Sequence, residues 1–189
     1  MIIRSLIGFL AMILLVFNAV FAKVEVNNDI SKYNEYIGKT AKEEYRTKWG
    51  LDETIFPKES NEGMDIIDYK MVYYNPWDAQ FLSYIVVDYN DEDYNEEVRR
   101  LKTYNSTEYV GYYGVTGFSK YELLAMYADS YNGFIYAITD GKNRIIYVEL
   151  IFCNYFYDLK YEEYIPIDYL PDGFDASDNN KYMKEHFYN

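Results

Sequence analysis

The stretch "GFIYAITDGKNRIIYVELIFCNYFY", residues 133–157, decides the fold of this chain. Aliphatic residues alternate with tyrosines on both sides of the turn "DGKN", which predicts two antiparallel strands joined by a tight turn. A turn of two or four residues would give the same two faces. The first expected face, which belongs to the core, carries Ile135, Ala137, Ile146, Val148, Leu150 and Phe152. The second carries Phe134, Tyr136, Ile138, Ile145, Tyr147, Glu149 and Ile151.

This second face is too apolar to be bare in water, and a helix downstream of residue 90 is available to cover it. The segment "DEDYNEEVRRLKTY", residues 91–104, places Tyr94, Val98 and Leu101 on one apolar stripe. Acidic residues fill its first turn and basic residues its last, as the helix dipole favours. Asp93 is the predicted N-cap, and Glu96 completes a capping box.

A hairpin is also predicted earlier in the chain. The runs "DYKMVYY" (68–74) and "AQFLSYIVVDY" (79–89) are rich in β-branched and aromatic residues. Between them, "NPWD" has the composition of a type I turn, which would place Trp77 at the tip of a loop. In the later hairpin, most tyrosines of the second face are expected to pack in the sheet, with their hydroxyl groups reaching water or a polar partner at its edges.

Residues 107–131 are harder to assign. The run "TEYVGYYGVTGF" (107–118) is predicted as a strand bent at its glycines. For residues 119–131, Ser119 and Glu122 form a capping box that favours a helix, whereas the alternation and the following turn "SYNG" favour a strand. We prefer the strand, which would make a meander of the last four strands.

The rest of the chain adds little regular structure. Residues 31–49 are compatible with a helix broken near Gly38, residues 53–65 with a loop, and residues after Ser177 with a short helix. The predicted fold class is therefore α+β: mainly an antiparallel meander sheet packed by one or two helices, after an N-terminal export segment. Residues 23–189 would form a single domain with an extended C-terminal tail.

The N-terminal segment predicts the destination of the protein. In residues 1–22, Arg4 precedes an apolar run from Leu6 to Phe17, and Val20 and Ala22 occupy the small-residue positions of a signal-peptidase site. Cleavage after Ala22 is the preferred interpretation, and an uncleaved signal anchor is the alternative. Either way the domain is expected to be extracytoplasmic, with membrane contact only through this segment.

Composition narrows the chemistry. The net charge is −13 with no basic cluster, which argues against nucleic-acid binding. Cys153 and His186 are the only cysteine and histidine, so we predict no metal site and no cofactor. Cys153 is expected to be a buried thiol; an intermolecular disulfide or a reactive thiol are the alternatives.

The acidic run from Asp91 fails the EF-hand pattern, because Glu96 and Lys102 stand at its sixth and twelfth positions. The run 172–178 is a weak calcium candidate.

These observations favour an exported, non-enzymatic binding or interaction domain with a protein or glycan partner. The candidate ligand-binding residues are Trp77 at its loop tip and Tyr112 and Tyr113 beside the glycine bends; the alternative for Trp77 is that it folds back onto its hairpin. No catalytic residue is predicted. Two other functions remain open: a small carboxylate-dependent glycan hydrolase, which needs two facing acids in a cleft, and a membrane-tethered structural subunit.

Overall fold

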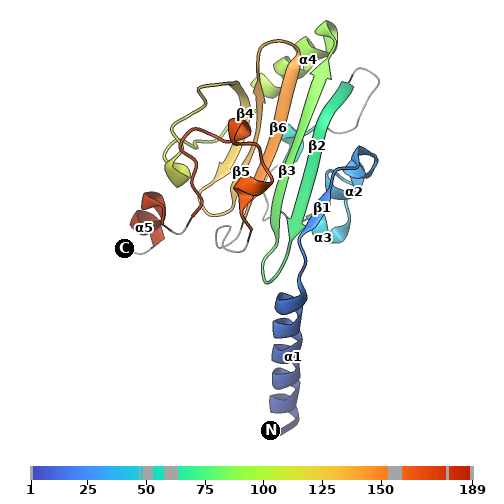
Figure 1. Ribbon diagram of the computed structural model, residues 1–189, viewed down its shortest axis with the longest axis vertical. Helices are drawn as coiled ribbons and strands as arrows, with labels where there is room; N and C mark the ends of the chain where they lie inside the picture. Colours follow the sequence, from blue (N-terminus) through green and yellow to red (C-terminus); the bar gives the residue numbers. More distant parts are fainter. Residues whose placement is uncertain are drawn as a thin grey trace.

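The computed structural model describes residues 2–46, 48, 53–57, 64–152, 159–177 and 179–187. Its centre is one six-stranded antiparallel sheet in the order β1-β2-β3-β6-β5-β4 (Figure 1). The α+β fold class with an antiparallel sheet is confirmed. The strands are β1 (Glu25–Asn27), β2 (Met64–Tyr74), β3 (Gln80–Tyr89), β4 (Glu122–Asp129), β5 (Gly133–Thr139) and β6 (Arg144–Ile151).

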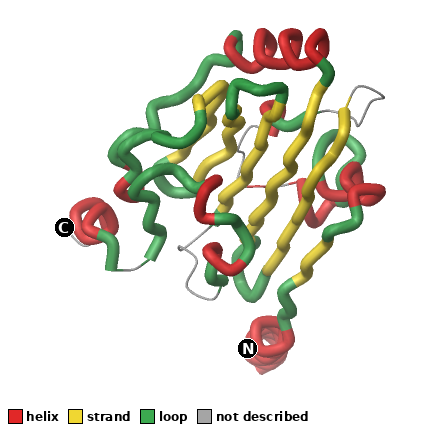
Figure 2. The backbone as a smooth tube through the Cα atoms, turned by 45° about the horizontal axis from the view of Figure 1, so that its top comes forward, coloured by secondary structure: helices red, strands yellow, loops and turns green. Residues whose placement is uncertain are grey.

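Short helices surround the sheet, and one longer helix stands apart from it. Figures 1 and 2 show α1 projecting away from the body at the N-terminal end, with Leu6, Phe9 and Leu10 more than half exposed. Over the described part of the chain, no helix meets both the length and the hydropathy that a membrane span needs. The helices are α1 (Ile2–Phe21), α2 (Tyr33–Tyr36), α3 (Glu43–Arg46), α4 (Asp91–Lys102) and α5 (Lys181–Phe187).

Both faces of the sheet are buried, and each has its own cover. One face, here called the helical face, packs against α2, α3, residues 53–57 and α4, with Ile37, Phe56 and Leu101 among the contributing side chains. The other, the tail face, packs against residues 109–118 and the C-terminal tail from residue 159 onward. The tail is therefore a structural layer, and it crosses the sheet in Figure 1.

The predicted hairpin between β5 and β6 exists, but the assignment of its two faces was wrong. Thr139 pairs with Ile145, which leaves five residues between them and reverses the expected parity. The Thr139 hydroxyl shapes this longer turn, because it donates to Arg144 O (2.6 Å) and accepts from Gly141 N (3.0 Å). Ile135 and Ala137 thus share the helical face with Tyr147 and the other odd-numbered residues of β6. Phe134, Tyr136 and Ile138 lie on the tail face with Ile146, Val148 and Leu150.

Helix α4 covers the helical face, which contains the expected β6 residues but not Phe134, Tyr136 and Ile138 of β5, and the N-terminal cap of α4 also differs from the prediction. Leu101 is fully buried, and Tyr94 and Val98 pack beside it, which confirms the apolar stripe. The cap is Asn90, whose side chain accepts from Asp93 N at 2.9 Å. Asp93 itself lies in the first turn, where its charge complements the helix dipole.

Residues 107–118 do not form the predicted strand. Gly111, Tyr113 and Gly114 have positive φ angles of 92°, 50° and 81°, and this left-handed backbone produces a tight turn instead. Residues 122–129 are a strand, which confirms the preferred assignment of that segment. The expected helix over residues 31–49 is reduced to α2 and α3, separated by left-handed Gly38, and Trp49 lies outside the described residues. The short C-terminal helix is confirmed as α5.

Candidate functional site

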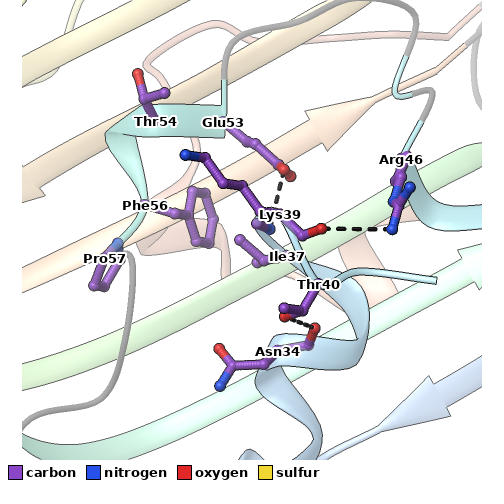
Figure 3. Close-up of a pocket in the computed structure, with 10 residues that line it drawn as sticks. Asn34, Ile37, Lys39, Thr40, Arg46, Glu53, Thr54, Phe56 and Pro57 are labelled. Carbon is purple, nitrogen blue, oxygen red and sulfur yellow. Dashed lines mark hydrogen bonds between the residues drawn. The ribbon is translucent and has the colours of Figure 1, made fainter. Parts of the chain in front are cut away.

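A pocket of about 680 Å³ opens between the α2–α3 segment and residues 53–57. This volume falls in the range of small-molecule sites in proteins, roughly 300–1,000 Å³. Ile37, Phe56 and Pro57 provide its apolar wall, and Lys39 and Arg46 supply two cations (Figure 3). The other described lining residues are Asn34, Gly38, Thr40, Glu53 and Thr54.

Hydrogen bonds fix the α2–α3 side of the pocket. The Arg46 guanidinium donates to Ala41 O at 2.8 Å and, more weakly, to Lys39 O at 3.5 Å. The Thr40 hydroxyl donates to Asn34 O at 3.1 Å. In Figure 3 the Lys39 side chain runs across the pocket toward Phe56 and Thr54. These hydrogen bonds to backbone carbonyl groups hold the loop in place. The Lys39 ammonium group can therefore contact a ligand in the pocket.

The opposite wall, residues 53–57, is anchored from three directions. Tyr33 donates its hydroxyl to Pro57 O at 2.7 Å, and Glu53 Oε1 accepts from Gly38 N at 3.0 Å. Arg100, on α4, donates to Thr54 O at 2.9 Å and to Ile55 O at 2.8 Å. This wall thus keeps its shape without belonging to a strand or a long helix.

Arg100 is itself oriented by a hydrogen-bond chain that starts in the sheet. It makes a two-pronged ion pair with Glu97, with both N–O distances at 2.7 Å. Glu97 Oε1 also accepts from the hydroxyl of Tyr147 on β6 at 2.6 Å, and that hydroxyl lies 2.7 Å from the hydroxyl of Tyr89 on β3. The pocket wall is therefore connected through α4 to the centre of the sheet.

Behind the pocket lies a buried ionic cluster. Lys48 Nζ lies 2.7 Å from Glu149 Oε1 and 2.9 Å from Glu53 Oε2. Ser83 donates its hydroxyl to the second oxygen of Glu149 at 2.7 Å. The Lys48 ammonium group also lies 5.5 Å from the centre of the Phe81 ring, within the range of a cation–π contact. The side chains of Lys48 and Glu149 are 1% and 0% exposed, so this pair has left water completely.

The ionisation of this cluster follows from two opposing effects. Burial on its own lowers the pKa of Lys48, because the low-dielectric interior disfavours the ammonium ion. The carboxylates of Glu149 and Glu53 outweigh that effect and raise its pKa above the ordinary lysine value. Lys48 therefore stays a cation at neutral pH, which makes it an electrostatic anchor for Glu53 and a poor nucleophile or base.

The three sequence-predicted residues lie elsewhere and do not form one site. Trp77 sits in the β2–β3 turn and is 59% exposed, as expected for a loop tip. Tyr112 is half-buried, with its ring centre 6.1 Å from that of Tyr182. Tyr113 is 0% exposed, contacts the rings of Phe152 and Tyr182, and donates its hydroxyl to Ser130 O. The left-handed turn directs the Tyr113 ring into the core of the tail face, so this candidate residue is buried.

No group of three metal-binding side chains occurs within the described residues. The acids that begin at Asp91 form the first turn of α4, as their capping and dipole pattern indicates. In the second acidic run, Asp172 Oδ1 accepts from the Ser119 hydroxyl and Asp175 Oδ1 from Ser177 N. Cys153 and Asp178 lie outside the described residues.

The paired carboxylates of the hydrolase alternative do not meet in this pocket among the residues described. Glu53 is the one acid in its described lining, and both of its oxygens face partners, Gly38 N and Lys48 Nζ. Glu149 lies behind Lys48, out of contact with solvent. The described lining therefore contains no pair of facing carboxylates.

No family model, no curated protein and no solved structure matches the chain. The site must therefore be interpreted from its own geometry. Sequence reasoning missed it, although one signal was present: Glu149 interrupts an otherwise apolar strand, and a buried acid needs a cation or a hydrogen-bond donor. The identity of that partner, Lys48, 101 residues earlier in the chain, required the structure.

Proposed function

We propose that this chain is an exported binding domain whose ligand occupies the pocket between the α2–α3 segment and residues 53–57. The observation that carries this proposal is the pocket itself. It has a volume of about 680 Å³, an apolar wall, the two cations Lys39 and Arg46, and a second wall that is held by hydrogen bonds from Tyr33, Gly38 and Arg100. Because the cavity is already formed before binding, the protein loses little conformational entropy when a ligand enters.

Several features support export. Arg4 and the apolar run that follows it have the order of a signal peptide or signal anchor. The described apolar side chains of α1, such as Leu6 and Phe9, are largely exposed, as expected for a segment that is either removed or inserted into lipid. Cleavage after Ala22 would remove no strand, because β1 begins at Glu25. All six strands are therefore kept whether residues 1–22 are cleaved or retained.

The location is tested by mass spectrometry of the protein recovered from its native host. A chain that begins at Lys23 outside the cytoplasm, or an intact chain in the membrane fraction facing outward, supports the proposal. A full-length chain found in the cytoplasm would overturn the export part and leave the pocket unaffected.

Ligand binding is tested with N-phenyl-1-naphthylamine, a neutral fluorescent probe that brightens in apolar sites. Asn34 lines the pocket, is exposed and makes no side-chain hydrogen bond to any described residue, so Asn34→Trp should block the pocket at little cost in stability. We expect saturable probe binding to the full chain that this variant removes. Glu96→Trp, on the exposed side of α4, is the matched control and should leave binding unchanged.

Trp77→Ala separates the two possible locations in the same assay. Binding that survives Trp77→Ala and is lost in Asn34→Trp supports the pocket. Loss in Trp77→Ala alone would move the site to the β2–β3 turn. Equal binding by all these variants would mean that the probe sits elsewhere, for instance on α1, and would overturn the pocket as the binding site.

A further inference from the structure

We infer that the ligand of this pocket carries an acidic group beside an apolar body, and that Lys39 is the residue that selects it. This inference rests on the proposed function, because it names the ligand class of the same site. The pocket combines an apolar wall with two cations, Lys39 and Arg46, on a protein of net charge −13. Such a local reversal of charge is what an anion-selective site requires.

The lining charges do not cancel one another. Neither Lys39 nor Arg46 forms an ion pair with a carboxylate of any described residue. Glu53 is already engaged by Lys48 and by the amide of Gly38, so it does not neutralise them. The same engagement makes Glu53 unsuitable for a cationic ligand, which would have to compete with a buried ammonium group 2.9 Å away.

The two cations have different tasks. Arg46 uses two of its five N–H donors on Ala41 O and Lys39 O, so it fixes the loop and also contributes a positive charge. Lys39 is exposed and extends across the pocket toward Phe56 (Figure 3). An acidic group near the ammonium end of Lys39 would leave the remainder of the molecule beside Phe56 and Ile37, which are only 1% and 3% exposed. The site thus suits a small acid whose apolar part is limited in size.

The overall negative charge of the protein repels an anionic ligand at long range. Screening by salt decides how far this repulsion offsets the attraction of the lining cations. At physiological ionic strength the Debye length is about 8 Å, so carboxylates farther away than that are largely screened. Lys39 and Arg46 line the pocket, so they act on a bound ligand within that length. Low salt would strengthen the distant repulsion and the local attraction together.

The test compares two probes that share an aromatic body and differ in charge. They are 1-anilinonaphthalene-8-sulfonate, which is anionic, and N-phenyl-1-naphthylamine, which lacks the sulfonate. Both are titrated into the full chain, and the signal that remains in Asn34→Trp is subtracted as binding outside the pocket. Removing one partly exposed charge should weaken the anionic probe by about threefold. Lys39→Gln is therefore expected to do this without changing the affinity for the neutral probe.

Lys39→Arg should restore the anionic preference, because it returns the charge to the same position. Lys32→Gln removes an exposed lysine outside the pocket lining and should change neither probe. An unchanged affinity ratio in Lys39→Gln, or an equal loss in Lys32→Gln, would overturn the assignment of an acidic ligand while leaving the pocket in place. If neither probe shows binding that Asn34→Trp removes, the proposed function itself fails.

Discussion

The buried pair of Lys48 and Glu149 gives the sharpest test of how this site is supported. Replacing Lys48 by Met leaves Glu149 buried with Ser83 as its remaining described hydrogen-bond donor, and replacing Glu149 by Gln leaves Lys48 with Glu53 as its remaining described carboxylate partner. Breaking a buried ion pair from one side costs about 3–5 kcal/mol, because an uncompensated charge stays in a low-dielectric interior. We expect Lys48→Met to lose stability by an amount in that range, and Glu149→Gln to lose less, because Glu53 still neutralises Lys48.

The double variant Lys48→Met/Glu149→Gln removes both charges and keeps an oxygen that can accept from Ser83. It should be more stable than Lys48→Met, because Glu149 no longer leaves a buried charge, and the coupling energy between the two substitutions should exceed about 1 kcal/mol. The free energy of unfolding is measured by urea titration, followed by circular dichroism. The exposed pair Lys102–Glu122 has the same 2.7 Å separation with side chains 52% and 58% exposed, and is the matched control. Its coupling should not exceed about 1 kcal/mol.

Additive single variants at Lys48 and Glu149, or losses no larger than those at the exposed pair, would contradict an unscreened buried cluster. Either outcome would mean that water reaches the cluster and screens it. Glu53 would then no longer be held by a buried cation, and the argument that it is unavailable to a cationic ligand would lose its basis.

Two further predictions concern the tyrosines and Arg100. Burial raises the pKa of Tyr33, Tyr136 and Tyr147 well above 10, so the unfolded chain ionises first and the stability present below pH 10 is lost as pH rises above it. The free energy of unfolding should fall by about 1.4 kcal/mol per pH unit for each such tyrosine, with tyrosinate absorbance appearing together with unfolding; exposed-type titration in a still-folded chain would contradict this. Arg100→Met should cost about 1–3 kcal/mol through its lost charged hydrogen bonds and should raise amide hydrogen exchange in residues 53–57, whereas Arg99→Met, on the exposed side of α4, should leave those amides protected.

Elements whose evidence is local could be predicted from the sequence. Helix α4 was found because an apolar stripe, an acidic first turn and a basic last turn all lie within twelve residues. The β2–β3 hairpin was found from two runs rich in β-branched and aromatic residues and a proline turn between them. In both cases hydrogen bonding and side-chain direction follow from neighbours only a few residues apart, and the periodicity of the sequence reports them directly.

Which residues of β5 and β6 share a face depends on whether the turn between the strands has an even or an odd number of residues. The alternation of side chains along the strands does not give that number. The Thr139 hydroxyl holds a turn of five residues between the last paired residues, and that odd number exchanged the faces of one strand relative to the other. Similarly, the glycines near Tyr113 suggested a bent strand, whereas three left-handed residues turned the chain into the core.

The sequence alone determined the fold class, the composition of the strands, the clearest helix and the order of charged, apolar and small residues in the N-terminal segment. The tertiary structure alone decided which residues meet in the pocket. Lys48 and Glu149 are 101 residues apart, and the pocket wall reaches the sheet through Arg100, Glu97 and Tyr147. Such contacts depend on how distant segments pack, and the free energy of burying a charge next to its counter-charge leaves no periodic pattern along the chain.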